Sequence, residues 1–106
     1  MQSRHEVVGR LVQRIVQLVH PLRIMLFGSA TSGDVSHGSD IDLLVVMPEG
    51  VHRRRTAQHL YREIRHVGIP FDVIVATPAD LERHRENVGL VYRSILATGK
   101  EVYAAR

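Results

Sequence analysis

Apolar residues recur at helical spacing near the N-terminus and in short continuous runs farther along the chain. The helical spacing predicts an amphipathic helix over about residues 3–19, begun by the capping pair Ser3 and Glu6 and ended by Pro21. Three apolar runs, bounded by glycine, proline or acidic residues, predict buried strands at about 22–27, 40–47 and 71–76. The pattern therefore mixes helix and strand along one short chain.

Two later stretches also have helical spacing. A helix is expected over about 51–67, before Gly68 and Pro70, and its apolar stripe consists of Ala57, Leu60, Tyr61, Ile64 and Val67. One helix, or two short ones, is expected over about 79–97, with Thr77 as its N-cap and Gly99 after its end. Residues 101–103 fit either a short strand or a packed tail.

The order helix–strand–strand–helix–strand–helix predicts an α/β (α+β) fold, a small mixed β-sheet with flanking helices. The short connection between the first two strands favours an antiparallel pair, and the helical crossover to the third strand favours a parallel pair. A chain of 106 residues can bury one modest core, so residues 1–106 are expected to form a single domain.

Composition excludes several classes of protein. Hydrophobic and charged fractions of 44% and 24% are those of an ordinary globular domain, and the absence of cysteine excludes disulfides and thiolate metal sites. No apolar stretch reaches the length of a membrane span, and the N-terminus lacks the layout of a signal peptide. We therefore expect no membrane partner and a cytoplasmic location.

The charge balance suits an anionic partner. The net charge is +3 and comes mostly from arginine, with Lys100 as the only lysine. Because the arginines are scattered and only three tyrosines and two phenylalanines could stack on bases, long nucleic acid is not expected.

Acidic residues interrupt the apolar pattern at the start of two strands. Asp40 and Asp42 are two apart and so share a strand face, on which the next residue, Leu44, is apolar. Two carboxylates at the edge of a core repel each other, and a magnesium ion between them removes the repulsion. If the third strand is parallel to the second, Asp72 joins them, and three carboxylates can hold two metal ions and activate a hydroxyl.

Gly28 and Ser29 follow the first strand. If that strand is antiparallel to the second, they lie next to Asp40, where a tight turn, a hydroxyl and backbone amides can bind a phosphate. Phosphate turn and carboxylates together favour in-line attack at a phosphorus atom of a nucleotide triphosphate.

Several of these residues also have plainer interpretations. Asp40 and Asp42 could be a solvated strand start, although aspartate is a poor strand former, and this interpretation is stronger for Asp72 alone. The histidines at 52, 59 and 66 are seven residues apart, about 10 Å along a helix, which is too far for one ion. Tyr61, Tyr92 and Tyr103 are expected to pack rather than to act as substrate.

The segment Leu26-Phe27-Gly28-Ser29, the ten-residue gap and the segment Ser39-Asp40-Ile41-Asp42-Leu43-Leu44-Val45 resemble the signature of polymerase-β-type nucleotidyltransferases. The small size resembles the minimal nucleotidyltransferases of bacteria and archaea, and nearly the whole chain fits, including Asp72. Relatives often carry arginine in the turn where this chain has Ala30-Thr31-Ser32.

The resemblance implies roles for individual residues. Gly28 and Ser29, with Ser39 beside them, would bind the nucleotide phosphates of ATP, and Asp40 and Asp42 would be magnesium ligands. Asp72 would be the third carboxylate, as ligand or general base, with two Mg²⁺ ions expected. Many relatives are antitoxins encoded beside a helical toxin of the HEPN class, and some transfer AMP to a tyrosine of that toxin.

Three functions follow as hypotheses. The first is an enzyme that transfers AMP to a hydroxyl of a HEPN-type toxin and so acts as its antitoxin, because the chain has no room for an acceptor site of its own. The second is an antitoxin that neutralises the toxin by binding alone. The third is a nucleotidyltransferase of the aminoglycoside-modifying type split over two chains. The sequence leaves homo-oligomerisation open.

Overall fold

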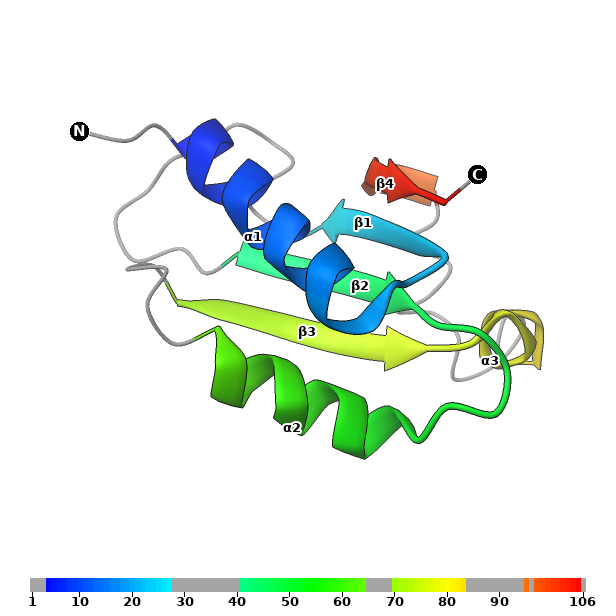
Figure 1. Ribbon diagram of the computed structural model, residues 1–106. Helices are drawn as coiled ribbons and strands as arrows, with labels where there is room; N and C mark the ends of the chain where they lie inside the picture. The colour runs from blue at the N-terminus through cyan, green and yellow to red at the C-terminus, as the bar shows by residue number, and fades with distance from the viewer. Residues whose placement is uncertain (1–3, 28–40, 65–69, 84–94, 96, 106) are drawn as a thin grey trace.

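The computed structural model describes residues 4–27, 41–64, 70–83, 95 and 97–105 (Figure 1). Three helices and four strands have both ends within these ranges, and residues 95, 97 and 98 are also helical. In chain order they are α1 (Arg4–Val19), β1 (Arg23–Phe27), β2 (Ile41–Val46), α2 (Arg53–Glu63), β3 (Phe71–Ala76), α3 (Pro78–Arg83) and β4 (Lys100–Ala104).

The four strands form one mixed sheet in the order β3-β2-β1-β4. β1 is antiparallel to both β2 and β4, and β2 is parallel to β3, so both predicted pairings are confirmed. The segment at residues 101–103, which the sequence left open, is part of the strand β4 along the outer side of β1. The sheet is the mixed sheet that the element order predicts.

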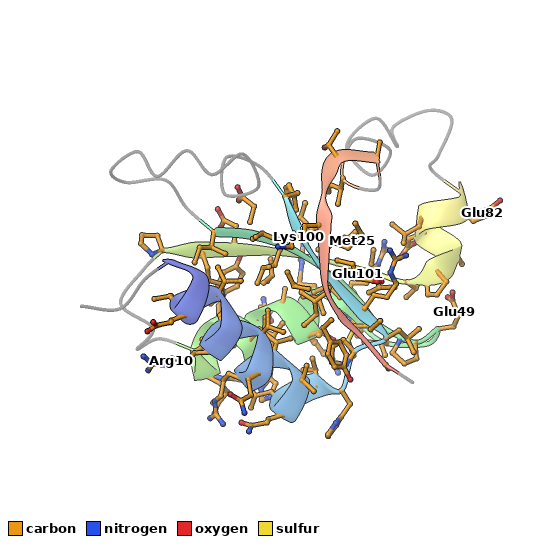
Figure 2. All side chains as sticks on the ribbon, turned by 90° about the horizontal axis from the view of Figure 1, so that it is seen from above. Arg10, Met25, Glu49, Glu82, Lys100 and Glu101 are labelled. Atoms are coloured by element: carbon orange, nitrogen blue, oxygen red, sulfur yellow. The ribbon has the colours of Figure 1, made fainter. Side chains whose placement is uncertain are left out.

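Helices α1 and α2 cover the same face of the sheet (Figures 1 and 2). The first helix packs its apolar stripe on that face through residues that include Leu11 and Ile15, and Leu60 and Ile64 do the same from α2 or its end. The sheet meets them with alternate residues of β2, because successive side chains of a strand point to opposite faces. This face holds the larger core, which comprises Val7, Val8, Leu11, Val12, Ile15, Ile24, Leu26, Ile41, Leu43, Val45, Met47, Leu60, Ile64, Val73 and Val75.

The opposite face of the sheet carries a smaller apolar cluster. Met25, Leu44, Val46 and Ala76 are buried there together with Ile95. Leu81 of α3 packs against them and covers the end of the face near the C-terminus of β3. The two faces therefore differ in how much helix covers them within the described residues.

The second helix is shorter than its sequence pattern predicts. It begins at Arg53 rather than 51, with the Nδ1 atom of His52 accepting a hydrogen bond from the backbone N–H of Arg55. It ends at Glu63 rather than near 67, because Ile64 leaves helical geometry at φ −113° and ψ 61°. Apolar spacing continued beyond that point, but Ile64 turns into the core, so the stripe did not mark the helix end.

The start of α3 is capped as predicted. The Thr77 hydroxyl accepts a hydrogen bond from the backbone N–H of Asp80 at 3.3 Å, while the Asp80 carboxylate accepts from the backbone N–H of Thr77 at 3.0 Å. This reciprocal pair is a capping box with aspartate in the place of glutamate. In the described part of the chain, no helix is long and apolar enough to cross a membrane.

Candidate active site

The parallel pairing of β2 and β3 brings two carboxylates side by side. Asp42 and Asp72 are direct partners in the strand register, and neighbouring strands lie roughly 4.8 Å apart. Partners in register point to the same face of a sheet, so the two side chains share a face. Asp42 is half-buried and Asp72 is exposed. The structure thus brings Asp72 to Asp42, as the predicted strand directions require.

The shared face turns from polar to apolar along the strands. One step inward from the carboxylates, Leu44 is the register partner of Ile74, and beyond them Val46 is the partner of Ala76. These residues belong to the smaller apolar cluster, on the face away from α1 and α2. The carboxylates therefore stand where the apolar surface of the sheet ends, at the N-terminal ends of β2 and β3.

The end of β1 meets the same place. Phe27, the last residue of β1 and the one directly before Gly28, is the register partner of Asp42. Gly28, Ser29, Ser39 and Asp40 lie outside the described residues, so their assigned roles stay predictions. Phe27 and Ile41, which flank residues 28–40 in the sequence, both lie at the end of the sheet that carries Asp42 and Asp72.

Tyr61 is a residue of this site that the sequence pattern assigned only to packing. It lies in the last turn of α2 and is 40% exposed. Its hydroxyl accepts a hydrogen bond from the backbone N–H of Val73 at 2.9 Å and donates one to Oδ1 of Asp72 at 3.3 Å. Its ring stacks on Phe71 with centroids 5.4 Å apart. The tyrosine therefore joins the helix to the strand that carries Asp72.

The surroundings of Tyr61 keep its hydroxyl protonated. Burial raises the pKa of Tyr61 above its ordinary value, and the charges of Asp72 and Asp42 raise it further against a lowering by the Val73 N–H. A neutral phenol has one O–H to donate, so this raised pKa preserves the hydrogen bond to Asp72. The sequence held one weak signal: Tyr61 is the single stripe residue of the second helix with a polar tip.

The donor set fits a hard divalent cation. Among the described residues no group of three histidine, cysteine, aspartate or glutamate side chains lies close enough to hold a metal ion. Asp42 and Asp72 supply two carboxylates, and magnesium is commonly bound by one or two carboxylates together with substrate phosphates and water. Two adjacent carboxylates also gain most from a cation, because each raises the cost of ionising the other.

Other candidates from the sequence are used for structure. His52 caps α2, so it is not part of a histidine metal stripe with His59. Arg53, the first of three consecutive arginines, forms an ion pair with the buried Asp80 at 3.1 Å. Tyr103 packs against the larger core from β4. His66 and Tyr92 lie outside the described residues.

Solved structures of toxin–antitoxin pairs contain chains with a similar fold. A mutant of the MntA–HpeT toxin–antitoxin has a TM-score of 0.58 at 19% identity, covering 99% of this chain and 76% of that one. A toxin–antitoxin structure with AMP-PNP has a TM-score of 0.56 at 20% identity, covering 98% and 76%. Tri-AMPylated Shewanella oneidensis HEPN toxin in complex with MNT antitoxin has a TM-score of 0.54 at 19% identity, covering 92% and 72%. The TM-scores show that these chains share the fold of this protein.

A comparison with curated proteins found no match. The family model described as a nucleotidyltransferase domain matches residues 8–97. That range runs from α1 to the segment before β4 and includes both Asp42 and Asp72. This chain therefore belongs to the nucleotidyltransferase domain family.

Proposed function

We propose that this protein is a magnesium-dependent nucleotidyltransferase that transfers AMP from ATP to a tyrosine hydroxyl of a helical HEPN-type toxin and so acts as its antitoxin. The observation that carries the proposal is the register pair of Asp42 and Asp72 at the end of an apolar sheet face, beside the strand that leads to Gly28 and Ser29. Family membership supports nucleotidyl transfer in general.

The chemistry follows from what the carboxylates can do. The acceptor oxygen attacks the α-phosphorus of ATP, the bond to the β-phosphate oxygen breaks, and pyrophosphate leaves. Asp72 is exposed and so can accept the proton of the acceptor hydroxyl. Asp42, with Asp40 beside it in the sequence, would hold magnesium, which neutralises the phosphate charge when bound. The phosphates would be held by the turn at Gly28 and Ser29.

The choice of donor and acceptor has separate support. One structure with a similar fold is a toxin–antitoxin with AMP-PNP, an ATP analogue. Another is a tri-AMPylated HEPN toxin in complex with its MNT antitoxin.

The test is to incubate the protein with the product of the neighbouring gene, ATP and Mg²⁺, and to measure the intact mass of that partner. We expect a mass gain in whole AMP units that Asp42→Asn abolishes and that Asp72→Asn slows about 10²–10⁴-fold. Glu101→Gln, an exposed carboxylate on the opposite edge strand, is the matched control and should transfer normally. If toxin is neutralised without any mass gain, and equally well by the aspartate variants, neutralisation is by binding alone.

A further inference from the structure

One side chain contacts three consecutive residues at the start of β3. The ring of Tyr61 stacks on Phe71 at an interplanar angle of 22°, its hydroxyl donates to Oδ1 of Asp72, and its oxygen accepts from the backbone N–H of Val73. β3 is an edge strand of the described sheet. The tyrosine therefore reaches across the sheet edge from the helix-covered face to the carboxylate on the other face.

These contacts determine where the hydroxyl proton points. A phenolic oxygen has one proton to donate, and the Val73 N–H takes one of its acceptor positions. The ring stack restricts rotation of the whole side chain. The hydroxyl is thus held as a donor toward Asp72, and an exposed aspartate that would otherwise change rotamer is restrained through one oxygen.

We infer that Tyr61 is a positioning residue for Asp72: it holds Oδ1 and so presents Oδ2 to the transfer reaction. The kinetic part of this inference rests on the proposed function, whereas its effect on cation binding does not. Hydrogen-bond partners that orient metal-binding or catalytic groups commonly contribute 10–100-fold to affinity or activity. A 3.3 Å bond to an exposed group belongs at the lower end of that range.

A purely structural role makes a different prediction. If Tyr61 served only to cover the Val73 N–H and to stack on Phe71, its hydroxyl would contribute to stability and nothing else. Its removal would then have the same effect whether or not residue 72 is a carboxylate. The coupling between Tyr61 and Asp72 therefore separates the two roles.

The test is a double-mutant cycle of Tyr61→Phe and Asp72→Asn, which keeps the ring stack and removes one hydroxyl or one charge. Four quantities are measured: kcat and KM for AMP transfer, Mn²⁺ affinity in the presence of AMP-PNP by electron paramagnetic resonance, and Tm. We expect Tyr61→Phe to lower kcat and Mn²⁺ affinity about tenfold, with KM for ATP little changed. In the Asp72→Asn background it should have no further effect.

Tyr103→Phe, on the opposite edge strand, is the matched control and should leave both kcat and Mn²⁺ affinity unchanged. The inference would be overturned if Tyr61→Phe lowered kcat and Mn²⁺ affinity equally in the wild type and in Asp72→Asn, or lowered neither. Either outcome would leave the proposed function intact. If the wild type binds Mn²⁺ but transfers no AMP, the proposed function fails and the Mn²⁺ cycle alone decides the role of Tyr61. A wild type that binds no Mn²⁺ overturns both.

Discussion

An aspartate lies near each end of β3, and the two differ in burial and in the number of donors that contact them. Asp80, four residues beyond the strand's end at the N-terminus of α3, is 6% exposed and is surrounded by donors: the backbone N–H and the hydroxyl of Thr77, both at 3.0 Å, and Arg53 at 3.1 Å. Asp72 at the strand start is exposed, stands beside a second carboxylate, and has one neutral hydroxyl as its donor among the contacts found in the described residues.

The difference separates structural from chemical use of the same residue type. A buried carboxylate is stable only when its oxygens are paired, so Asp80 is committed to holding the helix start. An exposed carboxylate beside a like charge contributes little to folding and retains capacity to bind a cation or a proton. Stability is commonly traded for activity at such sites. The end of the sheet with Asp72 is therefore the end suited to chemistry.

The sharpest test of this comparison is removal of the charge at residue 72. Asp72→Asn should lower AMP transfer about 10²–10⁴-fold, the usual cost of losing a general base. Its free energy of unfolding should stay within about 0.5 kcal/mol of the wild type, because the side chain is exposed. Intact-mass kinetics and urea unfolding measure the two effects. A large loss of stability would mean that Asp72 is structural after all.

The reverse outcome is expected at the other end of the strand. Asp80→Ala should lower the free energy of unfolding by about 2–3 kcal/mol, because it leaves Arg53 and the Thr77 donors without their charged acceptor. Transfer per folded molecule should not change. Chemical denaturation, with activity normalised to the folded fraction, measures both. Loss of transfer by the fully folded variant would contradict the separation of the two ends.

A substitution at Gly99 tests whether the fold also depends on close backbone packing beside β1. A Cβ at this position would clash with the carbonyl oxygen of Ile95 and approach that of Leu26 to 3.1 Å. Gly99→Ala should therefore destabilise the protein by about 1–3 kcal/mol. Gly9→Ala, in α1 with nothing within 4 Å, is the control and should stabilise it by about 1 kcal/mol. Thermal unfolding of the two variants compares them, and equal Tm values would refute the close packing.

The smallest effect is expected for an exposed ion pair. Arg23 and Glu101 are 2.7 Å apart across β1 and β4, with both side chains at least 40% exposed. Glu101→Gln should change the free energy of unfolding by less than about 1 kcal/mol, and this difference should disappear in high salt, which screens the ion pair. Urea unfolding at two ionic strengths measures it. A loss comparable to that of Asp80→Ala would show that burial does not govern the value of ion pairs in this fold.

Much of the fold could be predicted because the strands differ clearly from the helices in apolar spacing. The first helix and the first three strands of the chain lie within a residue or two of their expected bounds, and the parallel pairing followed from the crossover helix. The end of α2 could not be predicted, because the apolar spacing runs past Ile64 although the backbone is no longer helical at that residue. The sequence also could not decide between a strand and a packed tail for β4, because the strand forms by pairing with the outer edge of β1.

The candidate site divides in the same way. Counting residues placed each aspartate on a face of its own strand, and Asp72 was expected beside Asp42 on the condition that the third strand is parallel to the second. Tyr61 could not be placed by counting. Its stripe position predicts that it faces the sheet, but whether its hydroxyl reaches the core or the sheet edge depends on how α2 lies across β3.

The sequence by itself determined which residues are candidates for the chemistry and which neighbours share their strand face, since both follow from residue type and a period of two. Only the tertiary structure decided that Asp42 and Asp72 are direct register partners and that a tyrosine from α2 holds one of them. The physical reason is that register and helix placement are set by packing between segments distant in sequence, which no local pattern encodes.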